Sequence, residues 1–116
     1  MNRIIQIIAT LCLITLILMI FVGGTQPVAV NLFNPPWDKV IHIITFCVMF
    51  ILFSIALPKT TLALLLIWVV TIGMLDEIHQ IYLPGRSAGL DDLLADIVGS
   101  LIAYFTIKWL RKKCSL

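Results

Sequence analysis

Residues 40–57 read VIHIITFCVMFILFSIAL, a stretch without a single Asp, Glu, Lys or Arg. About 20 apolar helical residues cross a hydrocarbon core about 30 Å thick, so a stretch of this kind can span a membrane. Three further apolar stretches lie at residues 4–22, 61–82 and 92–110. None alternates apolar and polar residues as barrel strands do. Because a spanning segment must satisfy its own backbone, we predict that all four are helices.

The prediction for residues 1–116 is a single all-α domain, a polytopic membrane protein built as a bundle of four transmembrane helices. The composition supports it: 61% of the residues are hydrophobic, 12% are charged, and the mean hydropathy is +1.12. A soluble domain has about 45–50% apolar and about 25% charged residues. So few charges cannot cover a soluble surface, which excludes a soluble enzyme, a nucleic-acid-binding module and a disordered tail.

Helix-breaking residues lie between the apolar stretches and mark their ends. They are Gly23, Gly24, Pro27, Pro35, Pro36, Pro58, Pro84 and Gly85. Arg3 precedes the first stretch, as a basic residue does in a signal peptide. However, the apolar run is longer than the roughly 7–15 residues of a signal peptide's hydrophobic segment, and no A-x-A cleavage site follows. We therefore expect an uncleaved helix.

The three cysteines, Cys12, Cys47 and Cys114, lack metal-ligand spacing, and we expect reduced thiols.

The basic residues are divided unequally between the two ends of the predicted bundle. With four helices, both termini and the second loop share one end. That end carries six basic residues: Arg3, Lys59, Lys108, Arg111, Lys112 and Lys113. The other end carries only Lys39 and Arg86. Because Lys and Arg are enriched on the cytoplasmic side, we predict that the N and C termini are cytoplasmic.

All six acidic residues fall at the opposite, outer ends of the last three predicted helices. They are Asp38, Asp76, Glu77, Asp91, Asp92 and Asp96. Charged residues inside a membrane are expensive, face the interior of the bundle, and by default indicate a functional site. The sequence therefore predicts a polar cluster at the outer membrane face.

The second and fourth helices each carry polar residues on one face. Asp38 and His42 are four residues apart, and so are Asp92 and Asp96. In one interpretation these residues belong to a site. In the other, Asp38 caps its helix, Lys39 extends towards the lipid headgroups and His42 is a hydrogen-bonded packing residue.

The third helix places a carboxylate deeper in the membrane. Glu77 lies about 9 Å below the expected end of its helix, too deep to face lipid at low cost. Either it belongs to a site with Gln80, three residues later, or it forms a structural ion pair with Lys39 or Arg86. Arg86 itself either binds a phosphate or carboxylate or pairs with a neighbouring aspartate. Asp91 is expected mainly as a helix cap.

In chain order these residues form the pattern Asp38-Lys39-x-x-His42, Glu77-x-x-Gln80, Pro84-Gly85-Arg86 and Asp91-Asp92-x-x-x-Asp96-x-x-Gly99. The ordered set resembles the VanZ-like family of small bacterial membrane proteins over about residues 35–105. The resemblance implies a multi-pass protein of the bacterial plasma (inner) membrane, with no established reaction or cofactor. The family is named for a protein associated with low-level resistance to teicoplanin, a glycopeptide antibiotic acting at the outer surface.

The motif match covers part of the polar residues only. The family pattern is carried by Asp38, Lys39, His42, Glu77, Gln80, Arg86, Asp92 and Gly99. The chain departs from it at Asp96, where the family more often has Asn, and a charge in place of an amide changes the affinity for a proton or cation. Asp76 and His79 are not assigned to the pattern.

We predict a protein that binds or modifies an anionic envelope lipid, a cell-wall precursor or a glycopeptide-related ligand at the outer face, with a role in teicoplanin resistance. The predicted ligand-binding residues are Asp38, Lys39, His42, Glu77, Gln80, Arg86, Asp92 and Asp96. The expected partners are membrane lipids and not nucleic acid, and no cofactor is expected. The oligomeric state is left open.

Two alternative functions remain open beside a purely structural role. A membrane enzyme acting on a lipid phosphate would use Glu77, His42 or Asp96 as acid or base. The chain carries no recognised catalytic motif, which favours a protein that is not an enzyme. An Asp/Glu/His cluster can hold a divalent cation, but no metal site is predicted.

A small proton-coupled transporter is the third candidate. It is ranked last because transport sites usually lie near mid-membrane, whereas the acidic residues here are predicted near one membrane face.

Overall fold

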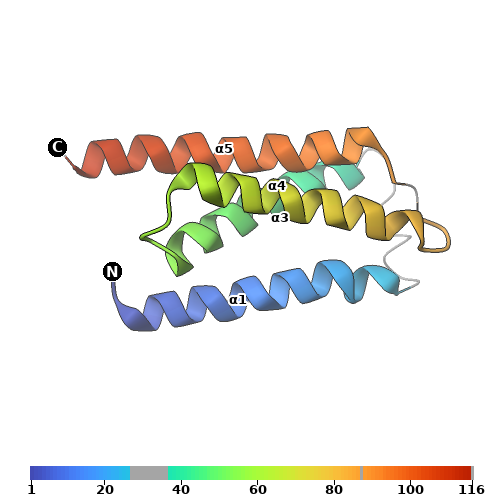
Figure 1. Cartoon of the computed structure of the whole chain (residues 1–116), viewed down its shortest axis with the longest axis horizontal. Helices are drawn as coiled ribbons and strands as arrows, with labels where there is room; N and C mark the ends of the chain where they lie inside the picture. Colours follow the sequence, from blue (N-terminus) through green and yellow to red (C-terminus); the bar gives the residue numbers. More distant parts are fainter. Residues whose placement is uncertain (27–36, 87, 116) are drawn as a thin grey trace.

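The structure, a computed structural model, describes residues 1–26, 37–86 and 88–115. Four long helices account for most of them: α1 (Arg3–Phe21), α3 (Trp37–Ala56), α4 (Leu62–Ile81) and α5 (Leu90–Cys114) (Figure 1). A short 3-10 helix, η1 (Gly23–Thr25), follows α1. No strand occurs in the described ranges. The predicted all-α architecture is confirmed, whereas the expected breaks at Pro27, Pro35 and Pro36 lie outside the described residues.

The helix ends differ from the predicted ones where charged residues extend a helix beyond its apolar run. Helix α3 begins at Trp37 with Asp38 in its first turn, and α5 begins at Leu90 and ends at Cys114, after three basic residues. Acidic side chains are favourable at a helix N-terminus and basic ones at a C-terminus. The apolar pattern therefore indicates only the part of each helix that lies in lipid.

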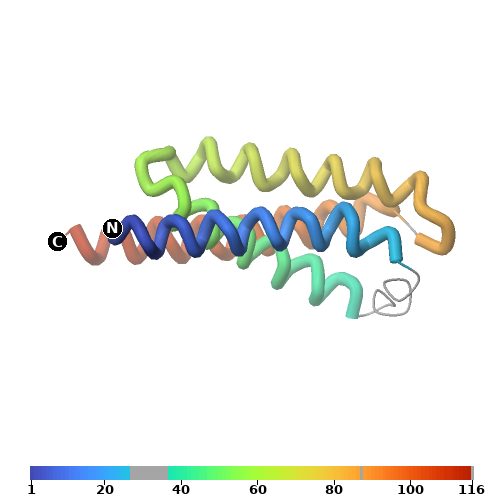
Figure 2. The backbone as a smooth tube through the Cα atoms, turned by 90° about the horizontal axis from the view of Figure 1, so that it is seen from below, coloured from blue at the N-terminus to red at the C-terminus, as the bar shows by residue number. Residues whose placement is uncertain are grey.

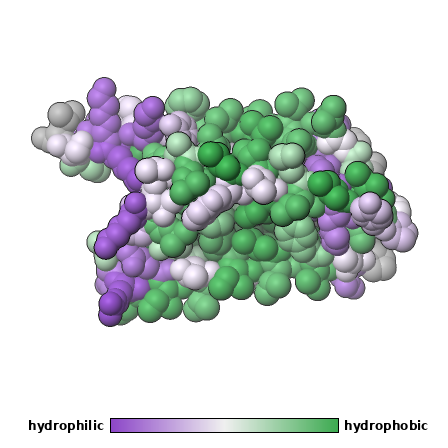
Figure 3. All heavy atoms as spheres, viewed as in Figure 1, coloured by the Kyte–Doolittle hydropathy of each residue, from purple (hydrophilic) through white to green (hydrophobic). Residues whose placement is uncertain are grey.

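The surface of the bundle is apolar, as expected for a membrane protein. All four long helices are long and apolar enough to cross a membrane. Hydrophobic side chains cover the middle of the face shown in Figure 3, and hydrophilic ones gather at its two ends. The molecule measures 49 × 26 × 20 Å, so its long axis exceeds the about 30 Å of a hydrocarbon core. This is the fold of a multi-pass membrane protein.

Helix α3 is the centre of the bundle and packs against α1, α4 and α5. The core between these helices consists of Leu13, Phe46, Met49, Phe50, Phe53, Leu65, Val69 and Ala103. A close approach is made at Gly99 of α5, where an added Cβ would collide with the backbone carbonyl of Ile43 on α3. A glycine at this position therefore permits α5 to lie directly against the backbone of α3.

The two ends of the bundle carry different connecting segments and different charged residues. Both termini and the turn between α3 and α4 lie at one end, while η1 and the loop between α4 and α5 lie at the other (Figures 1 and 2). The first end carries the basic tail of α5, Arg111, Lys112 and Lys113. This agrees with the predicted arrangement of the helices, and the cytoplasmic location of the termini stays a prediction.

The contact at Gly99 predicts a strong effect of a single methyl group. Gly99→Ala should lower the free energy of unfolding by about 1–3 kcal/mol, because overpacking forces α5 away from α3. Gly23→Ala is the control, since a Cβ at Gly23 meets nothing within 4 Å. Thermal unfolding of both variants in the same detergent measures the difference. Equal melting temperatures would contradict the close approach.

Candidate functional site

The polar residues of α3, α4 and α5 meet at the end of the bundle opposite the termini, in two groups. The inner cluster consists of His42, Asp76, Glu77 and Asp96. The ion-pair group consists of Asp38, Lys39, Asp91 and Asp92. Each group joins residues that are far apart in the sequence, so both depend on how the helices pack.

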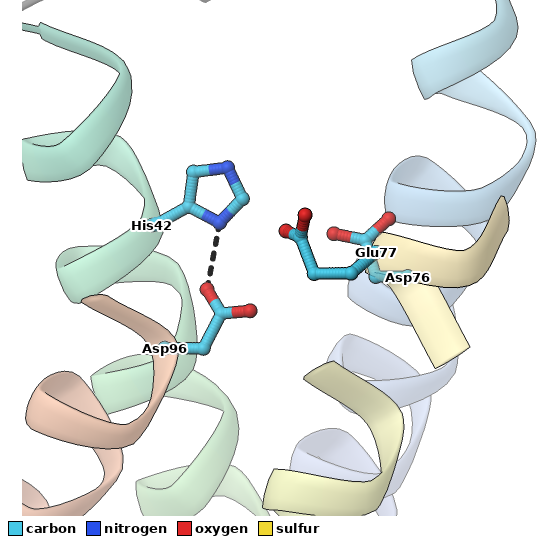
Figure 4. A group of neighbouring side chains, drawn as sticks. All are labelled: His42, Asp76, Glu77 and Asp96. Carbon is cyan, nitrogen blue, oxygen red and sulfur yellow. Dashed lines mark hydrogen bonds and ion pairs between the residues drawn. The ribbon is translucent and has the colours of Figure 1, made fainter. Parts of the chain in front are cut away.

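The inner cluster draws on three helices. His42 comes from α3, Asp96 from α5, and Asp76 and Glu77 come from α4 (Figure 4). All four side chains are buried, and each offers a potential ligand atom within 4.8 Å of those of the others. The carboxylates from α4 face the His42–Asp96 pair across the cluster (Figure 4). Four ionisable groups thus share one buried space.

His42 and Asp96 form a direct pair. The Nδ1 atom of His42 lies 2.6 Å from Oδ1 of Asp96, and the two side chains are 4% and 0% exposed. The backbone carbonyl of Asp96 accepts a hydrogen bond from Ser100 Oγ at 2.7 Å. Gly73 makes room on α4, because a Cβ there would lie 3.0 Å from Asp96 Oδ2. The pair is thereby held against α4.

The two carboxylates of α4 each receive one hydrogen bond from outside the cluster. The backbone N–H of Gly89 donates to Glu77 Oε2 at 3.1 Å. Gln80 Nε2 donates to Asp76 Oδ2 at 3.0 Å. Gln80 is therefore a supporting residue that orients Asp76. Asp76 belongs to the predicted polar cluster but is absent from the predicted ligand-binding residues, although its spacing of four from Gln80 was an available signal.

Two oxygens of the inner cluster have no protein partner. Glu77 Oε1 and Asp96 Oδ2 are buried and accept no hydrogen bond from any residue that the structure describes. An unsatisfied buried acceptor costs about 1–3 kcal/mol, and more when it is charged. Such atoms call for an explanation beyond packing.

The ion-pair group connects α3 to the start of α5. Lys39 Nζ lies 2.8 Å from Asp38 Oδ2 and 3.0 Å from Asp91 Oδ2, and it also donates to Asp92 Oδ1. Lys39 thus pairs with these aspartates rather than with Glu77. Helix α5 begins after Gly89 without a side-chain cap. The expected cap, Asp91, instead lies in the first turn and binds Lys39.

Arg86 lies in the loop between α4 and α5, outside the inner cluster. It is half-buried, and its Nη1 donates to the carbonyl of Gly24 at 3.1 Å. This contact ties the loop to η1, a link that neither interpretation of the sequence included. His79 packs its ring against Phe21 of α1, with ring centroids 5.5 Å apart.

These features define a class: a four-helix, multi-pass membrane protein with a buried polar cluster near one end of the bundle. The family model described as VanZ/LLP1 matches residues 6–111, nearly the whole chain. The chain therefore belongs to the VanZ/LLP1 family, as the resemblance predicted. It has no significant match among curated proteins or among solved structures.

The ion-pair group predicts unequal roles for its two adjacent aspartates. The Asp92 side chain is 7% exposed and that of Asp91 is 69% exposed, although both contact Lys39. Asp92→Asn should lower the free energy of unfolding by about 1.5–3 kcal/mol, the range for hydrogen bonds to charged groups. Asp91→Asn should cost clearly less, because exposed ion pairs contribute little to stability. Thermal unfolding in detergent tests this, and equal losses would contradict it.

Proposed function

We propose that this protein binds the charged headgroup of an anionic envelope lipid or cell-wall precursor at the outer face of the bacterial plasma membrane. The observation that carries the proposal is the inner cluster, in which three membrane helices bury four ionisable side chains and leave two oxygens without a partner among the described residues. Buried polar groups in a membrane bundle are expensive and mark ligand sites by default.

The polar end offers complementary chemistry for such a headgroup. Arg86 supplies a planar guanidinium, which suits a phosphate or carboxylate, and Lys39 supplies a compact ammonium. The carboxylates of the inner cluster suit an amine or sugar hydroxyls. A lipid-linked precursor carries both kinds of group. We extend the proposal to teicoplanin resistance, with which the protein that gave the family its name is associated.

The proposal requires the inner cluster to face outwards. In cells, a membrane-impermeant thiol reagent should label Tyr82→Cys, since Tyr82 is 81% exposed in the loop region after α4. The same reagent should leave Cys114, exposed near the C-terminus, unlabelled until the cells are permeabilised. Cys12 and Cys47 are replaced by alanine in the two proteins that are compared, the Tyr82→Cys variant and the chain that carries only Cys114. The reverse labelling pattern would place the cluster on the cytoplasmic side.

Headgroup binding predicts a specific effect of Arg86. A polyprenyl phosphate should raise the melting temperature of the purified full chain, while phosphatidylcholine should not. Arg86→Ala should raise the lipid concentration needed for half of this shift at least about tenfold, equivalent to about 1.4 kcal/mol of binding free energy. Because Arg86 also holds Gly24, each protein is compared with its own lipid-free state.

Arg111→Ala is the matched control, because Arg111 lies at the opposite end of the bundle in the last turn of α5. It should bind the polyprenyl phosphate as the wild type does. An unchanged melting temperature of the wild type with every lipid would contradict the proposal, and so would identical titrations of wild type and Arg86→Ala.

Turnover of the bound headgroup is the second candidate function. The observation that favours it is the 2.6 Å contact between His42 and Asp96, since a carboxylate that orients an imidazole supports acid–base chemistry. Release of phosphate from the lipid by the wild type and not by His42→Gln would assign this role. A transporter is less well supported, because Glu77 lies only one turn from the end of α4 at Ile81.

A further inference from the structure

We propose that the inner cluster is a binding site for one divalent transition-metal ion of the Mn²⁺ or Zn²⁺ class. The ligands are the carboxylates of Asp76, Glu77 and Asp96 and the imidazole of His42. The inference goes beyond headgroup binding, because it depends on the four side chains alone and requires no lipid.

The spacing of the four residues suits a single ion. Their potential ligand atoms all lie within 4.8 Å of one another. Oxygen and nitrogen ligands bind such ions at about 2.1 Å, so opposite ligands in one coordination sphere are about 4.2 Å apart. A contraction of roughly half an ångström across the widest pair would therefore complete the site, which is within the reach of side-chain rotation.

Charge balance also favours a cation. Three carboxylates share one buried space with His42, which pairs with Asp96. Arg86 acts on Asp76 by electrostatic attraction while it donates to the carbonyl of Gly24, so these two basic groups stand against three acidic ones. Lys39 contacts the aspartates of the ion-pair group instead. Buried charge is stable only when it is paired or coordinates a metal. A divalent ion would offset most of the repulsion among these carboxylates.

The two unpartnered atoms of the cluster are both acceptors. Glu77 Oε1 and Asp96 Oδ2 are buried without a hydrogen-bond partner among the described residues, in residues that are 8% and 0% exposed. Figure 4 shows the carboxylates of α4 and the His42–Asp96 pair facing one another. No described residue donates a hydrogen bond to either oxygen, and a cation between them would satisfy both.

The hydrogen bonds around the cluster resemble the outer shell of a metal site. Gly89 N–H holds Glu77 by Oε2, and Gln80 holds Asp76 by Oδ2, so each carboxylate keeps its other oxygen for the ion. Asp96 Oδ1 lies 2.6 Å from His42 Nδ1, so these two atoms stand side by side as ligands for the same ion. Carboxylates that bind a metal ion are commonly held by such hydrogen bonds from neighbouring groups.

The mixture of ligands selects the class of metal. Carboxylates suit Mg²⁺, Ca²⁺ and Mn²⁺, while imidazole suits Zn²⁺ and other transition metals. Three carboxylates and one imidazole therefore favour Mn²⁺ or Zn²⁺. Ca²⁺ prefers roughly six to eight oxygen ligands, and Mg²⁺ usually keeps several water ligands. Both ions should therefore bind to this site more weakly than Mn²⁺ or Zn²⁺.

The test uses the untagged full chain in detergent, stripped with a chelator and titrated with Mn²⁺ or Zn²⁺. Loss of the electron paramagnetic resonance signal of free Mn²⁺ should show saturable binding of one ion per chain. Glu77→Gln and Asp96→Asn should each weaken binding about 10–100-fold or more, since even outer-shell changes have effects of that size. Mg²⁺ at the same concentration should not displace Mn²⁺.

Two control variants match these changes. Asp91→Asn removes a carboxylate at the same end of the bundle but outside the cluster, and His79→Gln removes the second histidine of the chain. Both should bind Mn²⁺ as the wild type does. Binding that falls equally in Asp91→Asn or His79→Gln, or that persists unchanged in Glu77→Gln, would overturn the inference.

A measurement on the wild type alone covers the case in which the cluster variants fail to fold. With ¹⁵N-labelled histidine, Zn²⁺ should shift the ring nitrogens of His42 strongly and those of His79 little. No saturable binding, or no change at His42, would overturn the inference. Because no lipid is present, this outcome is independent of the polyprenyl phosphate titration.

Discussion

The contact between Gly99 and the backbone of Ile43 determines the geometry of the polar end. A glycine allows α5 to lie directly on α3, and one turn earlier along the same face stands Asp96. The close approach brings this carboxylate to His42 at 2.6 Å. Gly73 plays a similar part on α4, where the missing side chain leaves space for Asp96. Two glycines thus let three helices converge on one group of ionisable side chains.

In a membrane of low polarity, the ion-pair group and the inner cluster need different explanations. The ion-pair group lies at the beginnings of α3 and α5, and Lys39 links these helix ends through three aspartates. The inner cluster lies deeper and is incompletely satisfied. A buried charge network is rarely more stable than apolar packing of the same volume. Stability alone therefore does not explain the inner cluster, whereas the proposed binding of a ligand or ion would.

Much of the fold follows from local pattern, whereas the site depends on packing. The four helices could be predicted because lipid requires long apolar helical segments. His42, Glu77 and Asp96 could be selected as candidates because a polar side chain within such a segment is costly. Asp76, one residue deeper than Glu77, meets the same criterion but was not selected, since it does not belong to the family pattern. The link from Arg86 to Gly24 joins residues 62 positions apart, which no local spacing reveals.

The amino-acid pattern alone was sufficient for the number of helices, their membrane character and the collection of acidic residues at one end. These properties depend on the transfer of side chains between water and lipid, which each segment experiences independently. The division of the acidic residues into an ion-pair group and an inner cluster was decided only by the tertiary structure. It depends on the rotation of α3, α4 and α5 about their axes, and that rotation is set by side-chain volume at contacts such as Gly99 and Ile43.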